Sequence, residues 1–374
     1  MDAYRNNVGK FNKQRRFIFF SILGLSLFGI LMVYSASCVY AWNLYNEPSY
    51  FVKRQLLFLC ISAAVFFVVL SVNVEPLAKY GKEFMVVNII MLLLVLLIGK
   101  RIGGARRWFQ LGPINFQPSE LLKISFLLYT AGYIERKKNI MKYFKDGPLP
   151  ILLMAALTFI LVILEPDFGT VVFWLIWIFL MFFIGKVKSK HIFLLILCGA
   201  LASLVLVKTN PYRFRRVMTF INPWSDPRGD GFQIVQSQIA FGEGAIKGTG
   251  LGEGKQKFLF LPAAHTDFIF SIIAEEFGVV GSISVLLLYF AVFITMLRIS
   301  WRIKNDFSRF FCTGASILLG LEVVINVGVS CGFFPTKGMA LPFVSYGGTS
   351  LLVHYILLGI FFNITRTYEN YPGL

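Results

Sequence analysis

The residue best suited to chemistry is Asp267, in the segment His265-Thr266-Asp267 just before a long apolar stretch. A carboxylate at the start of a helix often serves only as a cap or as a partner of the helix dipole. The dipole lowers the pKa of such a carboxylate, so a general base there needs an opposing effect such as partial desolvation. A glycine-rich stretch bearing lysines, residues 242–260, leads into this segment. The combination of this stretch with a surplus of nearby cations favours a catalytic role for Asp267.

Basic residues in the loops on the same side as Asp267 indicate an anionic ligand. Arginine binds phosphate oxygens through paired hydrogen bonds, and lysine supplies a point charge. The candidates are Lys53, Arg54, Arg106, Arg107, Arg213, Arg215, Arg216 and Lys337. We expect most of the cluster at 213–216 to contact lipid headgroups. Asp167 is expected at the same face, where it can hold one of these cations in place.

Two apolar stretches carry polar pairs, although ionisable groups inside a membrane are rare without partners. Glu120 and Lys123 are three residues apart and share a helix face, so they can pair with each other or across the bundle. Glu322 and Asn326 are four residues apart and likewise share a face. We interpret the second pair as polar contacts between helices. A proton or ion pathway is the functional alternative.

Glu275 and Glu276 follow Asp267 in the same apolar stretch. At the helical rise of 1.5 Å per residue they lie about 12 to 13 Å further along. That depth is too great for direct contact with a ligand held at Asp267. We therefore expect them to hold the helix that presents Asp267.

The sequence indicates no metal site built from protein ligands alone. The 5 cysteines fall within or beside apolar stretches and lack paired spacing, so neither a disulfide framework nor a thiolate site is indicated. The 3 histidines are spread too widely to form a zinc site.

The elements that position these residues are predicted to be membrane-spanning helices. Of the 374 residues, 57% are hydrophobic and 16% are aromatic, which is typical of polytopic membrane proteins. The formal net charge of +17 would suit nucleic acid, but the basic residues cluster beside apolar stretches. Membrane orientation and anionic lipids explain that pattern better. We predict a single all-α transmembrane domain over residues 1–374 and no nucleic-acid partner.

About ten apolar stretches are long enough to cross the hydrocarbon core. The first is longer than the apolar region of a signal peptide, so we interpret it as a retained helix. The fifth and sixth are separated only by Glu165-Pro166-Asp167, and one bent helix is the alternative there. The stretches cover residues 17–40, 55–72, 84–99, 119–135, 149–164, 168–186, 191–207, 268–297, 310–331 and 343–364.

The lysines and arginines of the short loops place the N-terminus in the cytoplasm. An even number of spans then places the C-terminus there too. One long extracytoplasmic loop, at about 208–267, joins the seventh and eighth spans, and such loops in compact folds are usually functional. Turn residues at 222–227 and a short helix at 232–241 indicate that the loop is ordered. Its glycines permit a close approach of the backbone to a ligand.

Several separate motifs resemble the SEDS family, the polytopic glycosyltransferases of bacterial wall synthesis that include FtsW, RodA and SpoVE. The resemblance covers nearly the whole chain and rests on the joint order and spacing of the motifs. Residues 222–227 and 335–338 are closer to the FtsW and SpoVE branch than to RodA. The motifs are Gly103-Gly104-Ala105-Arg106-Arg107-Trp108, Phe116-Gln117-Pro118-Ser119-Glu120 with Lys123, Pro166-Asp167-Phe168-Gly169-Thr170, His265-Thr266-Asp267-Phe268-Ile269-Phe270, Pro335-Thr336-Lys337-Gly338, Leu341-Pro342-Phe343 and Ser345-Tyr346-Gly347-Gly348.

The resemblance implies polymerisation of lipid II, a disaccharide-pentapeptide on undecaprenyl diphosphate, at the outer face of the bacterial cytoplasmic membrane. Asp267 matches the family's essential aspartate, proposed to deprotonate the 4-hydroxyl of the acceptor sugar for attack on the donor glycan chain. Basic residues, with a divalent cation (magnesium or manganese) at an unknown site, would neutralise the diphosphate. The chain departs from the family at Ala263, where an acid is usual. The predicted substrate-binding residues are Arg54, Arg106, Arg107, Lys337, His265, Glu120, Lys123 and Asp167.

The predicted role is septal wall synthesis during cell division. A RodA-type elongation polymerase is one alternative, and a lipid II flippase or transporter is another, although no internal repeat of the kind that transporters show is evident. A non-catalytic scaffold ranks after these. The expected partners are a class B penicillin-binding protein transpeptidase and other membrane proteins of the divisome or elongasome.

Overall fold

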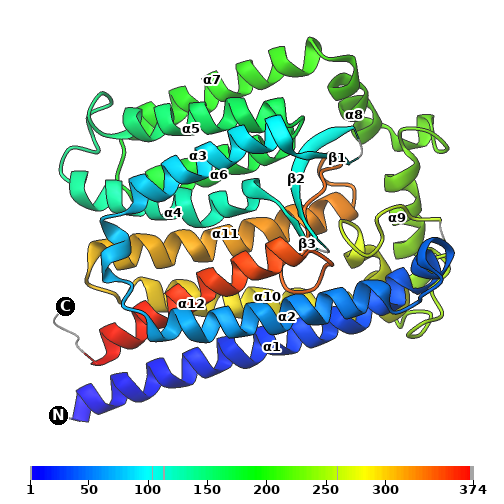
Figure 1. The fold of residues 1–374 in the computed structure, drawn as a ribbon, viewed down its shortest axis with the longest axis horizontal. Coiled ribbons are helices and arrows are strands. Elements are labelled where there is room, and N and C mark those ends of the chain that lie inside the picture. The colour runs from blue at the N-terminus through cyan, green and yellow to red at the C-terminus, as the bar shows by residue number, and fades with distance from the viewer. Residues whose placement is uncertain (1, 103, 113, 259, 371–374) are drawn as a thin grey trace.

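The computed structural model describes residues 2–102, 104–112, 114–258 and 260–370. Long helices lie side by side in a bundle, with the two termini at one end and the short elements gathered at the other (Figure 1). Each predicted apolar stretch coincides with one long helix. These helices are α1 (Asp2–Tyr45), α2 (Tyr50–Ser71), α3 (Gly81–Ile98), α4 (Pro118–Lys137), α5 (Pro148–Leu164), α6 (Phe168–Ile184), α7 (Ser189–Lys208), α10 (Ile269–Ser300), α11 (Asp306–Ser330) and α12 (Gly348–Asn370).

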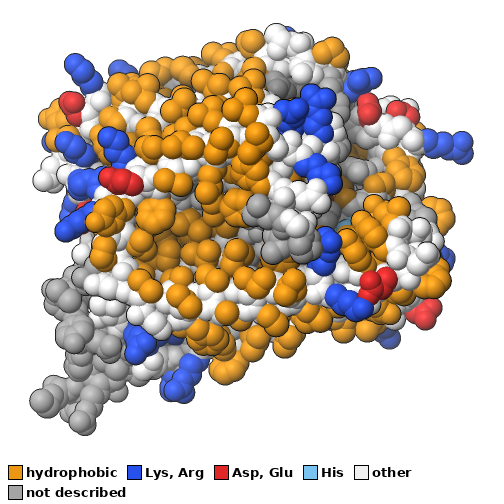
Figure 2. All heavy atoms as spheres, in the orientation of Figure 1, with side chains coloured by type: hydrophobic (Ala, Val, Ile, Leu, Met, Phe, Trp, Pro, Cys, Tyr) orange, Lys and Arg blue, Asp and Glu red, His pale blue; other side chains and the backbone are white. Residues whose placement is uncertain are grey.

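Within the described residues, 7 of these helices are long and apolar enough to cross a membrane, namely α1, α2, α3, α7, α10, α11 and α12. Helices α5 and α6 are apolar but shorter, at 17 residues each. Helix α4 has 20 residues and carries the charged pair Glu120 and Lys123. A band of hydrophobic side chains crosses the molecular surface, and lysines and arginines lie mostly toward its two ends (Figure 2). The chain is a multi-pass membrane protein.

The prediction of two helices around residues 165–167 is confirmed, and the alternative of one bent helix is wrong. Helix α5 ends at Leu164, α6 begins at Phe168, and the two pack against each other. Asp167 caps α6 by accepting a hydrogen bond from the amide of Thr170 at 3.1 Å. A proline preceded and followed by polar residues ends one helix and starts the next.

The prediction of a purely helical chain needs one correction. An antiparallel sheet lies between α3 and α4, formed by β1 (Lys100–Ile102), β2 (Ala105–Leu111) and β3 (Ile114–Phe116) in the order β1-β2-β3. Gly104 and Gly112, in the two turns, have φ angles of 82° and 61°, which suit glycine. Strands this short have too few alternating residues to be recognised in a sequence dominated by long apolar stretches.

The long loop between α7 and α10 is ordered, as predicted. It contains α8 (Pro211–Ile221), the 3₁₀ turn η2 (Pro223–Ser225) and α9 (Phe232–Gly244). The helix expected at 232–241 is confirmed as α9, which packs on α10 and α11, whereas α8 was not predicted.

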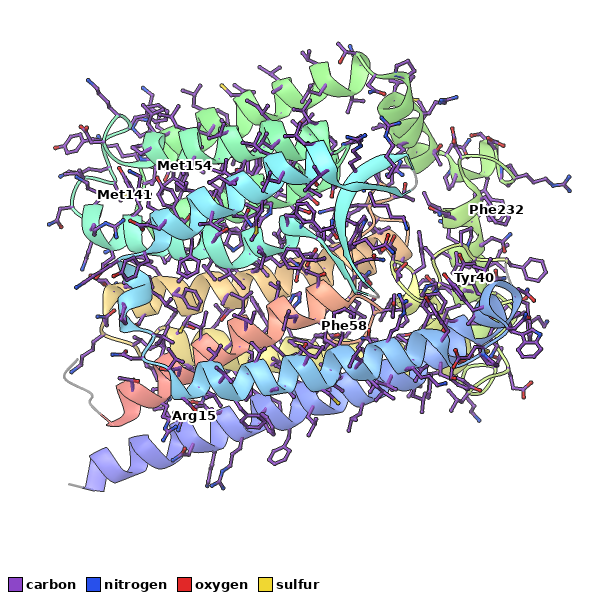
Figure 3. All side chains as sticks on the ribbon, in the orientation of Figure 1. Arg15, Tyr40, Phe58, Met141, Met154 and Phe232 are labelled. Atoms are coloured by element: carbon purple, nitrogen blue, oxygen red, sulfur yellow. The ribbon has the colours of Figure 1, made fainter. Side chains whose placement is uncertain are left out.

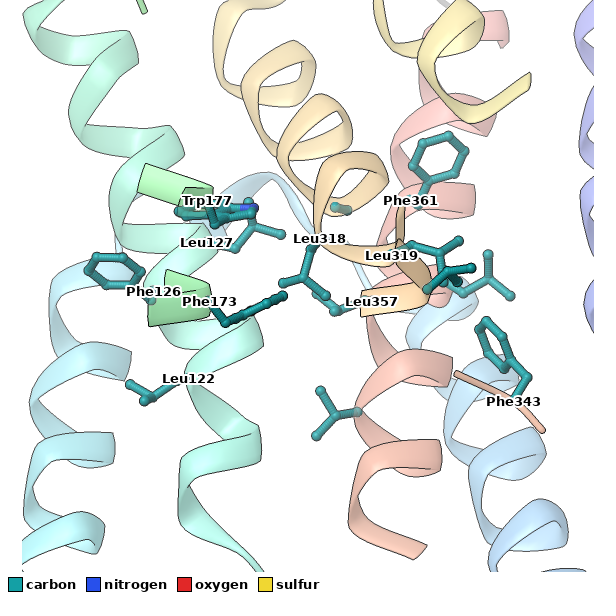
Figure 4. Close-up of a cluster of buried hydrophobic side chains, with 14 of the residues drawn as sticks. Leu122, Phe126, Leu127, Phe173, Trp177, Leu318, Leu319, Phe343, Leu357 and Phe361 are labelled. Carbon is teal, nitrogen blue, oxygen red and sulfur yellow. The ribbon is translucent and has the colours of Figure 1, made fainter. Parts of the chain in front are cut away.

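The core between α4, α6 and α11 combines large aromatic side chains with leucines (Figure 4). The ring of Phe126 lies 5.3 Å from that of Trp174 and 5.8 Å from that of Trp177. The indole of Trp177 donates a hydrogen bond to the carbonyl of Gly314 on α11 at 3.0 Å. Because these rings are fully desolvated and tightly packed, they hold α4, α6 and α11 rigidly together.

Candidate active site

Asp267 lies two residues before the start of α10, at the end of the bundle away from the termini. Its backbone carbonyl accepts a hydrogen bond from the side-chain amide of Asn326 on α11 at 2.9 Å. The same amide donates to the carbonyl of Met339 at 2.6 Å. One side chain therefore fixes the segment of Asp267 to the loop that joins α11 and α12.

The carboxylate of Asp267 lies directly against this loop at Gly338. A Cβ atom at position 338 would sit 2.9 Å from Oδ2 of Asp267, so only glycine leaves the carboxylate where it is. Burial, with a smaller contribution from the nearby charge of Asp167, raises the pKa of Asp267 to about 7 against the opposing influence of Arg216 and Lys337. Desolvation thus supplies the effect that a general base at a helix start requires.

Lys337 brings a buried ammonium group to the same site. Among the described residues no hydrogen-bond partner reaches its Nζ atom, which lies 5.0 Å from the ring centre of Phe173. Its aliphatic stem covers Gly169, where an added Cβ would come within 2.6 Å of it. Burial lowers the pKa of Lys337 to about 8, against the opposing influence of Asp167 and Glu322. Such a group can still donate to an incoming oxyanion.

Asp167 borders the site from the start of α6. Its two carboxylate oxygens accept hydrogen bonds from the amide and the hydroxyl of Thr170, at 3.1 and 2.8 Å. Its charge acts on both Asp267 and Lys337, as their pKa shifts record. Asp167 thus lies near the cation Lys337, and its location at the outer face remains a prediction.

Arg216 on α8 belongs to the site, although the sequence pattern favoured a lipid contact for most of residues 213–216. Its Nη1 donates to the carbonyl of Thr336, the residue before Lys337, at 3.0 Å. Its charge opposes the rise in the pKa of Asp267. Arg215, by contrast, points to exposed Asp230 at 3.8 Å. The side chain of Arg213 lies outside the described residues. The packing of α8, which the sequence does not show, decides that Arg216 and not Arg215 lies at the site.

Arg106 and Arg107 on β2 bind backbone carbonyls. Arg106 donates to the carbonyls of Leu96 and Leu97, at 3.1 and 2.8 Å, and so caps the end of α3. Arg107 donates to the carbonyls of residues 165 and 166, both at 2.6 Å, which fixes the turn before Asp167. Their contact with a diphosphate remains a prediction.

Glu165, in that turn, was not singled out from the sequence. It is fully buried, and neither of its carboxylate oxygens has a hydrogen-bond partner among the described residues. Burial raises the pKa of Glu165 to about 8, with a smaller contribution from Asp167 and an opposing one from Arg107. A carboxyl group in this state is protonated at neutral pH and adds no negative charge to the site.

His265 and Arg54 lie among aromatic rings beside the site. The ring of His265 packs 4.5 Å from Phe51 and 5.7 Å from Tyr346, and its carbonyl accepts the amide of Tyr346 at 2.9 Å. Burial lowers the pKa of His265 to about 4, so the imidazole is neutral. The guanidinium of Arg54 stacks 4.5 Å above the ring of Tyr50. His265 positions the chain here, and substrate contact by either residue remains a prediction.

Glu120 and Lys123 form a buried ionic network inside the bundle. Lys123 binds Glu120 at 2.7 Å and Glu322 on α11 at 2.5 Å, and Glu322 also binds Nε2 of His354 on α12 at 2.5 Å. The predicted pairing therefore occurs both along α4 and across the bundle. The charges of Glu120, Lys123 and Glu322 influence the pKa of Lys337, so the network lies close to the site. Contact of the network with substrate remains a prediction.

Helix α10 is broken at Gly278, whose φ of 65° and ψ of −164° are not helical. The amides of Thr249 and Gly250 donate to the carbonyls of Glu275 and Glu276, each at 3.0 Å. The two amides after the break donate in return to carbonyls of residues 245 and 246, at 3.0 and 3.3 Å. A segment of the glycine-rich loop thus supplies the hydrogen bonds that the helix lacks.

The carboxylates of Glu275 and Glu276 fasten this loop. Glu275 accepts the amides of Lys255 and Gln256, at 2.5 and 3.1 Å. Glu276 accepts hydrogen bonds from the ammonium of Lys257 at 3.0 Å and from the hydroxyl of Ser35 on α1 at 2.5 Å. As expected, both residues hold the helix that presents Asp267. The close approach that the glycines allow is to the backbone of α10, as at Gly248, whose added Cβ would lie 2.2 Å from the carbonyl of Glu276.

Comparison with known proteins adds the family to this geometry. The sequence model of the FtsW, RodA and SpoVE family, described as cell cycle protein, matches residues 15–370. The chain belongs to this family. Over 371 residues it is 35% identical to a probable peptidoglycan glycosyltransferase FtsW from Geobacter metallireducens, with 99% of each chain covered. Another such FtsW, from Francisella salina, is 41% identical over 349 residues, which cover 92% of this chain and 87% of the relative.

Two solved structures of similar fold support the membership. One is a chain from work on the structural coordination of polymerization and crosslinking by a peptidoglycan synthase complex. It aligns with a TM-score of 0.76 at 29% identity, over 94% of this chain and 97% of that one. The rod shape determining protein RodA of Thermus thermophilus aligns with a TM-score of 0.70 at 27% identity, over 93% and 95%. The FtsW/RodA/SpoVE arrangement thus extends over nearly the entire chain.

Proposed function

We propose that this chain is a peptidoglycan glycosyltransferase that polymerises lipid II at the outer face of the bacterial cytoplasmic membrane. The observation that carries the proposal is Asp267, a half-buried and desolvated carboxylate whose pKa is raised to about 7 and which the charges of Lys337 and Arg216 influence. The family to which the chain belongs and the names of its relatives agree with that activity.

The site has the two groups that an inverting glycosyl transfer needs. Asp267 takes the proton from the acceptor 4-hydroxyl as the oxygen bonds to the anomeric carbon of the donor chain. The bond from that carbon to the diphosphate breaks, and the diphosphate leaves with both electrons of the bond. A base with a pKa near neutrality suits the first task, and fixed cations suit the second. Lys337, whose ammonium has no described partner, is the first candidate to meet the diphosphate.

The same proposal includes a divalent cation, magnesium or manganese. Among the described residues no group of three or more histidine, cysteine, aspartate or glutamate side chains could hold a metal ion. Magnesium usually binds through one or two carboxylates together with substrate phosphates, so it does not need such a group. Asp167 would provide a carboxylate, and the ion would neutralise charge on the diphosphate.

The proposed topology has ten spans, with both termini in the cytoplasm and residues 208–267 outside. Both termini lie at one end of the bundle in Figure 1. The ring of His265, two residues before Asp267, lies 5.6 Å from Tyr40 near the far end of α1. Helix α1 therefore spans the distance between the cytoplasmic end and the site.

The proposed role is septal wall synthesis with a class B penicillin-binding protein as the crosslinking partner, and with other divisome membrane proteins. The FtsW names of the relatives favour division over RodA-type elongation. A structural relative comes from a complex in which polymerization and crosslinking are coordinated. Septal or lateral localisation of a tagged copy distinguishes the two roles.

The test uses purified full-length protein with its partner, lipid II and a divalent cation. Wild-type protein should make glycan strands that resolve on a gel, and Asp267→Asn should make none. Asp230→Asn, at an exposed acid in the same outer segment, is the matched control and should retain activity. Full polymerase activity in a well-folded Asp267→Asn variant would contradict the proposal.

A lipid II flippase is a second candidate, because the network of Glu120, Lys123, Glu322 and His354 lies within the bundle. Vesicles with labelled lipid II separate the two functions. Translocation that is lost in Glu120→Gln and retained in Asp267→Asn would favour the flippase.

A further inference from the structure

A cavity of about 420 Å³ opens at the end of the bundle opposite Asp267, between residues 12–20 of α1 and the ends of α2 and α12. Sites for small ligands typically measure about 300–1,000 Å³. Figure 3 labels Arg15 near this end, where Figure 1 places both termini. The described lining residues include no acidic side chain. They are Asn12, Arg15, Arg16, Phe19, Phe20, Leu70, Phe362 and Arg366.

The lining changes from charged to apolar in the same direction on two helices. On α1, Arg15 and Arg16 precede Phe19 and Phe20 by one turn, about 6 Å at 1.5 Å per residue. Helix α12 runs toward the same end of the bundle, and there the apolar Phe362 comes one turn before Arg366. Both helices therefore place guanidinium groups toward the end of the bundle and aromatic rings toward the membrane interior. A phospholipid has the same order along its length, with a charged headgroup phosphate followed by apolar acyl chains.

The frame of the cavity is fixed by contacts that need no ligand. Asn363 on α12 donates to three backbone carbonyls at the end of α2, at distances from 2.7 to 3.2 Å. The ring of Phe66 lies 6.0 Å from that of Phe19 and 5.7 Å from that of Phe362. The side chain of Phe20 is still 64% exposed at the rim. A rigid frame with an open, cationic and aromatic lining is suited to a ligand that is both anionic and apolar.

We propose that this cavity binds an anionic phospholipid of the cytoplasmic leaflet, whose phosphate meets Arg15, Arg16 and Arg366. Its acyl chains lie along the phenylalanine rings. Arginine binds phosphate oxygens bidentately, and basic pockets between membrane helices on the cytoplasmic side bind anionic headgroups. The bound lipid joins the start of α1 to the end of α12. The inference rests on the proposed orientation of the chain and not on polymerase activity.

The test titrates purified full-length protein in a neutral detergent with phosphatidylglycerol, phosphatidylcholine or inorganic phosphate, and counts bound lipid by native mass spectrometry. We expect phosphatidylglycerol to bind at least tenfold more tightly than phosphatidylcholine. The double variant Arg16→Gln with Arg366→Gln should lose roughly 25-fold in that affinity, about fivefold for each arginine. Lys142→Gln with Lys145→Gln removes two exposed charges at the same end and should bind as the wild type does. Equal affinities in the two double variants would overturn the site.

A second pair of variants separates a lipid from a free anion. Phe20→Ser should weaken phosphatidylglycerol binding severalfold, whereas Phe17→Ser, at an exposed phenylalanine outside the lining, should not. Both positions are exposed, so folding is retained. If inorganic phosphate competes with phosphatidylglycerol at equal concentration, or if Phe20→Ser binds the lipid as tightly as the wild type, the lipid assignment is wrong.

Discussion

The side-chain amide of Asn326 donates to the backbone carbonyl of Asp267 at 2.9 Å, and this bond ties the proposed base to α11. The second bond of this amide, to Met339 at 2.6 Å, holds the loop that carries Lys337. The separation of the base from the cation therefore depends on one buried side chain. The sequence indicated Asn326 as a polar contact between helices, whereas its amide binds the non-helical segments at Asp267 and Met339.

Replacing Asn326 with alanine should affect both stability and catalysis. The change removes the donor to two backbone carbonyls, which costs roughly 2–6 kcal/mol in total at about 1–3 kcal/mol each. We expect a lower unfolding temperature and at least a tenfold loss of kcat in lipid II polymerisation. Ser316→Ala on the same helix is the control, since that hydroxyl donates to the carbonyl of Cys312 one turn away on its own helix. A normal kcat in the Asn326→Ala enzyme would mean that Asn326 does not position Asp267 for catalysis.

The pH dependence of polymerisation should report the pKa of Asp267. Because the base acts when deprotonated, kcat should rise with pH up to about 7, where the group titrates. Asp167→Asn removes a charge that raises the pKa of Asp267, so its rise should move to lower pH. Arg216→Gln removes a charge that lowers this pKa, so its rise should move to higher pH. Rate profiles between pH 5 and 9 give the comparison, and three coincident profiles would refute the assignment.

Asp267→Asn should stabilise the protein while it abolishes activity. Burial raises the pKa of Asp267 from 3.8 to about 7, so the folded protein holds this proton more tightly than the unfolded chain. The wild type therefore loses stability as pH rises from about 4 to 7, and the loss is constant above that range. The unfolding temperature of Asp267→Asn should exceed that of the wild type at pH 8, with the difference shrinking toward pH 4. Asp230→Asn, at an exposed acid, should show no such trend.

The buried pair of Lys257 and Glu276 should be strongly coupled. Glu276→Gln leaves the ammonium of Lys257 buried beside a neutral partner, and breaking a buried pair costs about 3–5 kcal/mol. Adding Lys257→Met should recover part of that loss, because no unpaired charge then remains. A double-mutant cycle on the free energy of unfolding measures the coupling. Glu253→Gln, at an exposed acid of the same loop, is the control, and additive losses would mean that the pair is not coupled.

The positions of the long helices follow from the sequence alone. An apolar stretch of about 20 residues in a lipid environment must satisfy its backbone internally, and a helix does so with local hydrogen bonds. This is why ten stretches read from composition coincide with ten helices of the bundle. Asp267 could be found from its sequence context, because a glycine-rich, lysine-bearing stretch and a surplus of cations accompany it, whereas a carboxylate at a helix start alone often serves only as a cap.

The partners of the charged side chains were decided by the tertiary structure. Arg107 and Arg216 looked alike in sequence, as outer cations, yet Arg107 binds carbonyls before α6 whereas Arg216 turns toward Asp267. Similarly, the glycines of the long loop suggested a ligand surface, but their segment fills the break in α10 at Gly278. These contacts join residues 26 to 59 positions apart, and local composition carries no record of which elements meet. Helix formation is local, whereas the partner of a charge is set only when the bundle packs.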